Sequence, residues 1–194
     1  VKIYLKGILP NFYNGQNDIH YYFIQKGLEL LKKEGVIEYI VSRYFFEALH
    51  GKLLRKYIIE NSNIKKIIDF SILRNFEEAD TLTTILKLEE KADSDNTRSN
   101  EIQILKVIQD KAWKVKDYQK ISKEILNSID NKIKTSKEYG ENFEIFTKEQ
   151  QVLTDEKWFF STPKIEAIKN KMNENAKTLD NYFDTGQGMK TGLN

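Results

Sequence analysis

Three short apolar runs determine the architecture of this chain: VIEYIV at residues 36–41, IKKIIDF at 64–70 and TLTTILKL at 81–88. Each run is rich in β-branched residues, as expected of a buried strand. The third run follows the second too closely for a crossover helix to fit between them. We therefore place the third strand antiparallel to the others.

The residues between the first two runs predict a helix. Its apolar positions recur at helical spacing, and they are Leu49, Leu53, Tyr57 and Ile58. A helix between two strands is typical of a βαβ unit with a parallel pair of strands. The fold class is therefore α/β.

The N-terminal segment combines turn residues with a helix. Residues 1–17 are rich in glycine and asparagine, which predicts a loop. Asp18 is the expected N-cap of a helix that runs to about Lys33, and Gly35 suits a left-handed C-cap. The apolar stripe expected to face the sheet consists of Ile19, Tyr22, Phe23, Leu30 and Leu31.

The second half of the chain has a less regular pattern. Residues 101–108 predict an edge strand that pairs with the third strand as a hairpin. Residues 113–133 predict an amphipathic helix, and 143–146 and 158–160 resemble short strands. Pro163 can begin a last helix that extends to about residue 177.

Composition excludes several classes of function. The chain has 194 residues and a net charge of +2, and it contains no cysteine. Its two histidines, His20 and His50, lack metal-ligand spacing, so we predict no metal site. We expect no membrane span, no signal peptide and a cytoplasmic location.

The chain begins with Val1 rather than methionine, and it stops in a glycine-rich stretch. We expect it to be a piece of a longer protein. Residues 111–137 are rich in lysine, which can track phosphates or simply solvate a helix face.

The loop after the first strand is a candidate binding crevice, because loops beyond the carboxyl ends of strands form the sites of open α/β sheets. It carries Arg43 and three aromatic residues, Tyr44, Phe45 and Phe46. For Phe45 and Phe46 we favour the alternative, in which they pack the next helix against the core.

Taken in order, several segments resemble one family. They are LLKKEG at 30–35, the strand at 36–41, LLRKYI at 53–58, the strand at 64–70, NFEEAD at 75–80, the strand at 83–88, Trp158-Phe159 and GMKTG at 188–192. This ordered set resembles the second half of the catalytic domain of adenine-specific DNA methyltransferases of restriction-modification systems. The resemblance covers most of residues 18–90 and resumes near 158–194.

The resemblance implies a fold, a cofactor and a reaction. The fold is part of a Rossmann-like sheet with a terminal antiparallel strand, followed here by a mainly helical appendage. The cofactor is S-adenosylmethionine, the partner is double-stranded DNA, and the methyl group goes to the exocyclic amine of adenine. The family's glycine-rich cofactor loop and Asn-Pro-Pro-Tyr signature are absent from this sequence, whose nearest text is LPNFY at 9–13. We therefore expect the chain alone to be inactive, with no catalytic residue and most of the donor site missing.

The resemblance assigns one residue to the target base. In the family, an aromatic residue in the loop before the antiparallel strand stacks on the flipped adenine, and Phe76 occupies that position. A base must leave the duplex before its amine can react, and stacking holds the extruded base. The alternative is that Phe76 caps the core of the sheet.

Basic residues suggest contacts to DNA phosphates. Lys190 and Thr191 resemble the start of the family's target-recognition region. Arg43 and Lys52 can line a phosphate-facing rim. Arg55 and Lys56 can do the same or can be solvated charges of the helix.

The sequence divides into residues 1–110, the second half of the catalytic domain, and 111–194, a helical or linker segment that leads to target recognition. Two alternatives stay open: a DNA-binding or specificity module without chemistry that uses the lysine-rich helix, and a plain α/β structural domain. A free edge beside the first strand favours the fragment, and we expect such a fragment to form a homodimer through that edge.

Overall fold

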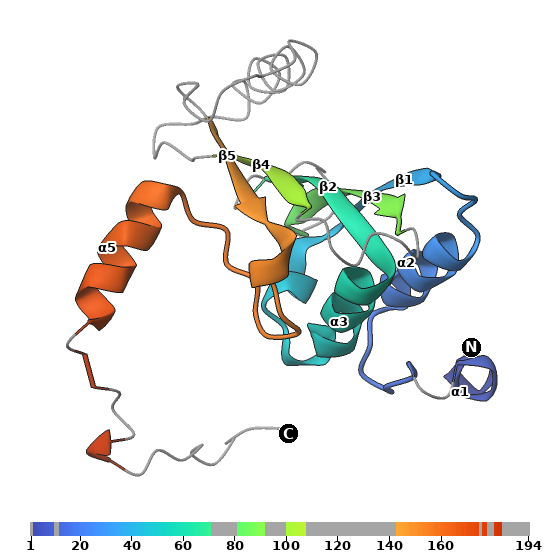
Figure 1. Cartoon of the computed structure of the whole chain (residues 1–194). Coiled ribbons are helices and arrows are strands. Elements are labelled where there is room, and N and C mark those ends of the chain that lie inside the picture. Colours follow the sequence, from blue (N-terminus) through green and yellow to red (C-terminus); the bar gives the residue numbers. More distant parts are fainter. Residues whose placement is uncertain are drawn as a thin grey trace. The chain divides into compact units, whose positions relative to one another are not determined.

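The computed structural model describes residues 2–9, 12–70, 81–91, 100–107, 143–174, 176–177 and 181–183. It divides into two compact units, Val1–Phe160 and Ser161–Asn194. The second unit holds helix α5 (Pro163–Asn173). The elements of the first unit (Figure 1) are, in chain order, α1 (Lys2–Ile8), α2 (Ile19–Glu29), β1 (Val36–Ser42), the 3-10 turns η1 (Arg43–Phe46) and η2 (Leu49–Gly51), α3 (Lys52–Asn61), β2 (Ser62–Asp69), β3 (Thr83–Glu90), β4 (Glu101–Val107), β5 (Phe143–Glu149) and the 3-10 turn η5 (Gln150–Val152).

The described strands form one five-stranded mixed sheet in the order β1-β3-β2-β4-β5. β3 is antiparallel to β1 and β2, which confirms its predicted direction. β1 and β2 therefore run the same way and are joined by α3, as a βαβ unit requires. The expectation that they pair with each other is wrong, because β3 lies between them. The helical connection between β1 and β2 leaves room for one strand between them. β3 occupies this place and pairs with β1 on one edge and with β2 on the other.

Strand β4 is an interior strand of the sheet. It pairs in parallel with β2 and antiparallel with β5, so the predicted hairpin with β3 is wrong. β3 has no edge left for β4, because β1 and β2 already occupy both. The sequence of β4 fits this position, since Ile104 is buried on one face and Leu105 on the other. The strand predicted at 143–146 is confirmed as β5, whereas residues 158–160 form no strand.

Helix α2 is confirmed, but of the residues predicted to face the sheet Tyr22 is buried, whereas Ile19, Phe23 and Leu30 are exposed. Tyr21, Ile24 and Leu28 are buried, whereas Phe23 is 62% exposed. The helix ends at Glu29, so the following leucines lie outside it. An apolar stripe on the other side of α2 is thus left uncovered, and with Phe23 it contains Ile19 and, just past the helix, Leu30.

Helix α3 shows a shift of the same kind. It buries Leu54, Arg55 and Ile58, whereas Leu49 is 78% exposed in turn η2. Of the predicted stripe, Ile58 is confirmed as buried, whereas Leu49 and Leu53 are exposed. The α-helix begins only at Lys52, after a 3-10 turn that breaks the helical period.

Two predictions for the N-terminal segment are also wrong. Helix α1 lies within the stretch predicted as a loop. Glu34, not Gly35, has the positive φ of 61° before β1. Gly35 is needed for another reason, since a Cβ atom there would lie 2.6 Å from the carbonyl oxygen of Lys32. The amphipathic helix predicted at 113–133 lies outside the described residues.

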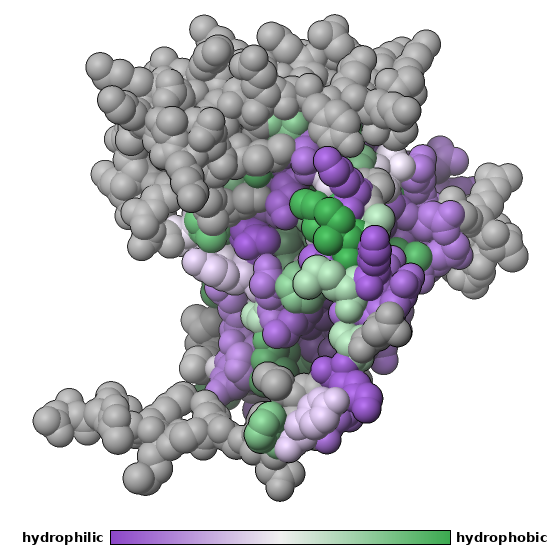
Figure 2. Space-filling model, turned by 90° about the vertical axis from the view of Figure 1, so that its left-hand side faces the viewer, coloured by the Kyte–Doolittle hydropathy of each residue, from purple (hydrophilic) through white to green (hydrophobic). Residues whose placement is uncertain are grey.

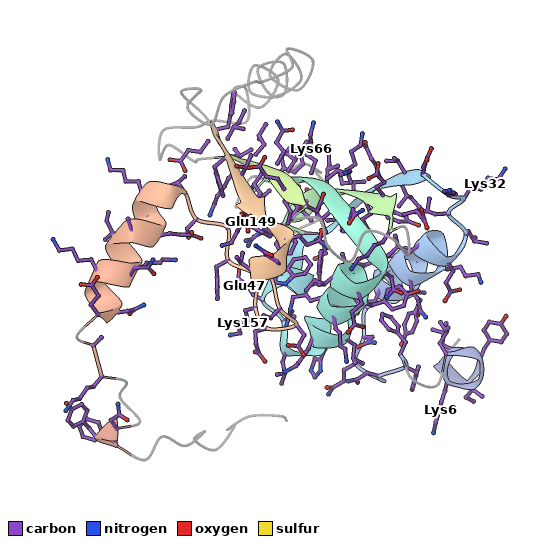
Figure 3. All side chains as sticks on the ribbon, viewed as in Figure 1. Lys6, Lys32, Glu47, Lys66, Glu149 and Lys157 are labelled. Carbon is purple, nitrogen blue, oxygen red and sulfur yellow. The ribbon has the colours of Figure 1, made fainter. Side chains whose placement is uncertain are left out.

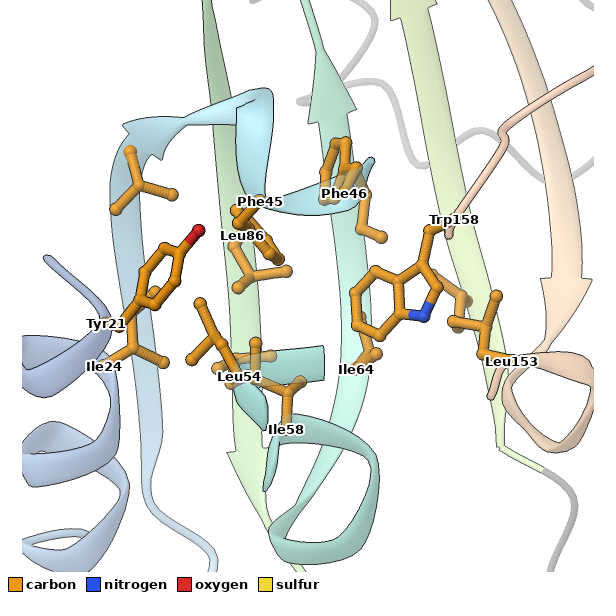
Figure 4. Packing of buried hydrophobic residues seen from close by; sticks show 14 of the residues in the cluster. Tyr21, Ile24, Phe45, Phe46, Leu54, Ile58, Ile64, Leu86, Leu153 and Trp158 are labelled. Carbon is orange, nitrogen blue, oxygen red and sulfur yellow. The ribbon is translucent and has the colours of Figure 1, made fainter. Parts of the chain in front are cut away.

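The main core lies on the face of the sheet that α2 and α3 cover (Figure 4). It joins both helices to the aromatic residues of η1 and to Trp158. A smaller cluster occupies part of the opposite face, and it comprises Ile68, Leu105, Val107, Phe143 and Ile145. Charged residues also lie on that face: Lys66 is one of them (Figure 3), and Lys87 forms an ion pair with Glu38 at 2.9 Å.

Within the described part of the chain, no helix is long and apolar enough to cross a membrane. On the face shown in Figure 2, hydrophobic residues form small patches among hydrophilic ones. Helix α5 confirms the predicted last helix, with Pro163 in its first turn. It presents three exposed apolar residues at helical spacing, Ile165, Ile168 and Met172.

Candidate functional site at the carboxyl ends of the parallel strands

The carboxyl ends of β1, β2 and β4 meet at one edge of the sheet, because these three strands run in the same direction. The strands end at Ser42, Asp69 and Val107. Loops at this edge form the binding crevice in open α/β sheets. The residues that follow β1 and β2 are therefore the first place to look for a site.

An ion pair connects the ends of β1 and β2. The Nε of Arg43 donates to Oδ1 of Asp69 at 2.9 Å, and Nη2 lies 3.4 Å from Oδ2. The Asp69 side chain is only 1% exposed, so its carboxylate depends on a charged partner. Nη2 also lies 3.3 Å from a carboxylate oxygen of Glu47. The predicted DNA contact Arg43 thus sits at the expected edge, with its guanidinium held by two carboxylates.

Phe45 and Phe46 of η1 belong to the core, which confirms the packing interpretation for these two residues, whereas Tyr44 is exposed. Phe45 and Phe46 are fully buried and contact the ring of Trp158 (Figure 4). Phe46 also contacts Phe160 edge to face. The turn after β1 is therefore filled by aromatic rings.

Lys52 lies at the start of α3, at the same end of the sheet. Its Nζ lies 2.6 Å from Oε1 of Glu156 and 3.5 Å from Oδ2 of Asp155. The hydrogen bond to Glu156 and the nearby Asp155 raise the pKa of Lys52. Its role in DNA binding stays a prediction, and a phosphate at Lys52 would compete with these two carboxylates.

Arg55 is a buried structural residue, which neither interpretation from the sequence anticipated. Its Nε donates to the carbonyl of Asp155 at 2.9 Å, and its Nη1 donates to the carbonyls of Phe45 and Ala48. Burial lowers the pKa of Arg55. The signal in the sequence that could have indicated burial of Arg55 is its place beside Leu54 and three residues before Ile58, on the buried side of α3. Lys56, in contrast, is a solvated charge paired loosely with Glu60.

His20 lies near the same edge, at the start of α2. Its Nδ1 is 3.1 Å from Oδ1 of Asp18, and its ring contacts Phe45. Burial lowers the pKa of His20, and Asp18 opposes this effect. The described residues contain no group of three or more potential metal ligands.

Three of the predicted site residues, Phe76, Lys190 and Thr191, lie outside the described residues. Their roles stay predictions. The structure does describe both flanks of the segment that carries Phe76, namely Asp69 and Phe70 on one side and Leu82 on the other.

Comparison with known proteins finds one matching family model for the N-terminal part of the chain. Residues 1–76 match the family model of the Eco57I restriction-modification methylase. The match covers 76 of the 194 residues, less than half of the chain. This segment spans the edge just described from α1 through β2, including Arg43, Lys52 and Asp69.

Two curated relatives are similar to parts of this chain. The chain is 33% identical over 91 residues to the type II restriction enzyme and methyltransferase RM.Eco57I of Escherichia coli, which covers 47% of this chain and 9% of the relative. It is 28% identical over 182 residues to the type II methyltransferase M.AccI of Acinetobacter calcoaceticus, which covers 93% of this chain and 30% of the relative. The chain thus spans less than a third of the length of either relative.

A solved structure is similar at a lower level. The type IIG restriction endonuclease BpuSI aligns with a TM-score of 0.49 and 19% identity, over 77% of this chain and 16% of that protein.

Proposed function

We propose that this chain is part of a site-specific adenine DNA methyltransferase from a restriction-modification system. The intact protein would transfer a methyl group from S-adenosylmethionine to the exocyclic amine of adenine in double-stranded DNA. The match of residues 1–76 to the Eco57I family carries this proposal. The ordered resemblance of residues 18–90 and 158–194 supports the adenine class.

The exposed edge of the sheet supports the interpretation as a part of a larger domain. Among the described strands, none pairs with the outer side of β1. Ile40 on this strand is 52% exposed, and α2 lies beside it, with the hydroxyl of Tyr39 donating to the carbonyl of Phe23 at 2.9 Å. An uncovered apolar edge is rare in a complete domain. Its presence argues against a plain structural domain.

The described residues do not fit S-adenosylmethionine. A nucleotide-like cofactor needs a turn after a strand where the backbone is open to the ligand. The turn from β1 to α3 is filled by Phe45 and Phe46, and its single glycine, Gly51, is closed by the carbonyl of Phe45. We therefore assign the donor site to other parts of the intact protein and derive no methyl-transfer step from the described residues. This chain alone would be inactive.

We further propose the division predicted from the sequence. Residues 1–110 would complete the catalytic domain, and residues 111–194 would lead to target recognition through Lys190 and Thr191. Strand β5, from the second part, joins the sheet of the first.

Calorimetric titration of the 194-residue chain tests the proposal. We expect it to bind duplex DNA with an affinity that falls as salt rises, because phosphate contacts release counterions. We expect no saturable binding of S-adenosylmethionine. Failure to bind DNA would contradict a DNA-contacting role for this part, and saturable cofactor binding would contradict our placement of the donor site.

A second titration tests Phe76. A duplex with a mismatched adenine should bind more tightly than a matched one, because less unpairing is needed to extrude the base. Phe76→Ala should weaken binding to the mismatched duplex by about 1–3 kcal/mol. Phe159→Ala, which removes an exposed phenylalanine of the described residues, is the control. Equal losses in both variants would exclude a specific stacking role for Phe76.

The uncovered edge of β1 leads to one more proposal, that the isolated chain forms a homodimer through it. Sedimentation should show a dimer, and Ile40→Lys should convert it to a monomer, because a charge on an edge strand blocks pairing. Ile168→Lys on α5 is the control, since both isoleucines are 52% exposed. A wild-type chain that stays monomeric at high concentration would refute this proposal.

A further inference from the structure

One exposed tyrosine lies in a turn whose other aromatic residues are buried. Tyr44 is the second residue of η1 and is 55% exposed. The two residues after it, Phe45 and Phe46, are fully buried in the core (Figure 4). Among the described residues, the side chain of Tyr44 has no hydrogen-bond partner and no ring contact. Packing of the core therefore does not account for this aromatic ring.

The backbone around Tyr44 is held in place by hydrogen bonds. Its N–H donates to the Oγ of Ser42 at 3.4 Å. The next carbonyl, that of Phe45, accepts from the guanidinium of the buried Arg55. The carbonyl after that accepts from the N–H of Trp158 at 2.8 Å. The ring is thus presented from a fixed turn, which reduces the ordering cost when it binds a ligand.

This turn begins where β1 ends, at Ser42. Loops at this edge of an open α/β sheet form the binding crevice. A tyrosine offers a large, flat contact area and loses little side-chain entropy on binding, because only two torsions become fixed. Tyr44 is therefore placed to contact a flat ligand at the edge.

The charges beside Tyr44 favour an uncharged ligand surface over a phosphate. The N–H of Glu47 donates to the carbonyl of Tyr44 at 3.1 Å, which places the two residues on adjacent parts of the turn. The Glu47 side chain is 45% exposed, and its carboxylate lies 3.3 Å from Nη2 of Arg43. A phosphate on the ring of Tyr44 would be repelled by this carboxylate and would compete with it for Arg43. The face of a nucleobase carries no charge and avoids both costs.

We propose that Tyr44 is a base-stacking residue, whose ring packs on a nucleobase that becomes accessible when the duplex opens. This inference rests on the proposed function, in which the adenine leaves the duplex before methyl transfer. Extrusion of one base exposes its own faces and those of its former neighbours in the stack. Every base has a π-face, so an aromatic side chain stacks on it with little dependence on sequence. Tyr44 adds affinity for opened DNA without a phosphate contact.

A series of substitutions at Tyr44 tests this role in the 194-residue chain. Fluorescence anisotropy measures binding to a labelled duplex that carries a mismatched adenine. We expect Tyr44→Ala to raise the Kd by about 5- to 150-fold, which corresponds to the loss of one stacked base. Tyr44→Phe keeps the ring and should bind like the wild type, whereas Tyr44→Leu keeps apolar bulk without a flat face and should resemble Tyr44→Ala. The control Tyr4→Ala removes a tyrosine of α1 that is 67% exposed and should leave the Kd unchanged.

The salt dependence of binding provides a second readout. The slope of log Kd against log salt should be the same for the wild type and Tyr44→Ala, because a stacking ring releases no counterions. A smaller slope in the variant would assign Tyr44 to a phosphate contact and overturn the proposal, as would wild-type affinity in Tyr44→Ala or Tyr44→Leu. These outcomes leave the proposed function intact. A wild-type chain that does not bind the duplex would instead contradict the DNA-contacting role itself, and the stacking role with it.

Discussion

Replacing Arg55 with methionine tests whether a buried arginine holds the turn after β1 in place. Arg55 is 2% exposed and donates to three carbonyls, those of Phe45, Ala48 and Asp155. The carbonyl of Ala48 also accepts from the N–H of Gly51 at 3.0 Å, so it keeps a partner in the variant. The buried carbonyl of Phe45 and the partly buried carbonyl of Asp155 lose the donor that Arg55 supplies.

The expected loss follows from these two carbonyls. A buried polar group without a partner costs about 1–3 kcal/mol, and the partly buried carbonyl of Asp155 adds less than a second full cost, which gives about 2–5 kcal/mol in total. Methionine keeps most of the apolar stem, and removing a buried charge returns part of the cost. We therefore expect the free energy of unfolding to fall by about 2–4 kcal/mol. For a chain of this size, each kcal/mol corresponds to a Tm decrease of about 2–4 °C.

Urea unfolding, followed by tryptophan fluorescence, measures this loss. Trp158 is a suitable reporter because it is buried against the same turn. Lys56→Met, on the exposed side of α3, is the matched control and should change stability by less than about 0.5 kcal/mol. If Arg55→Met is as stable as this control, the carbonyl contacts do not hold the turn and the reasoning fails.

Three further perturbations address other parts of the first unit. The free energy of unfolding should fall as the pH drops below 6.5, the ordinary pKa of histidine. Burial lowers the pKa of His20 in the folded chain, so the unfolded chain takes up the proton first. Urea unfolding measured across this pH range should show a smaller fall for His20→Gln. Gln150→Leu leaves an N–H of β2 without its acceptor and should cost about 1–3 kcal/mol in urea unfolding, with the exposed Gln151→Leu unchanged. Gly51→Ala places a Cβ atom 2.4 Å from a carbonyl oxygen of η1 and should lower the Tm by the equivalent of about 1–3 kcal/mol, whereas Gly15→Ala, whose nearest atom is 3.6 Å away, should not.

The strand predictions succeeded where the pattern was local. The runs at 36–41, 64–70 and 81–88 all correspond to strands, and the short third connection correctly implied an antiparallel β3. The order of the strands in the sheet could not be predicted from the pattern of apolar residues. A run of β-branched residues indicates a strand but carries no information about its neighbour, so the insertion of β3 between β1 and β2 had to come from the fold.

The helices illustrate a different limit. In α2 and α3 the existence of a helix was clear, but its buried face was assigned only in part, because both helices carry more apolar residues than one face can hold. Tyr22 and Ile58 were assigned correctly. Phe23 and Leu28 are equally apolar, yet only Leu28 is buried. Which face packs depends on where the helix sits on the sheet, and an uncovered second face is itself informative about missing partners.

Some features of the candidate site could be predicted from the sequence, and others could not. The sequence correctly indicated the turn after β1 as a crevice position and the packing role of Phe45 and Phe46. It did not reveal that Arg43 bonds to Asp69 or that Arg55 is buried, because both bonds join residues that only the tertiary structure brings together.

From the sequence alone follow the α/β class, the direction of β3 and the resemblance to restriction-modification methylases, since these depend on residue periodicity, connection length and ordered motifs. The tertiary structure decided the order of the strands, the exposed edge of β1 and the partners of Arg43. These depend on which surfaces meet once the chain folds, and burial selects among residues that look equivalent along the chain. A charge such as that of Arg43 or Arg55 has a solvent role or a structural role according to the carbonyls and carboxylates that the fold places beside it.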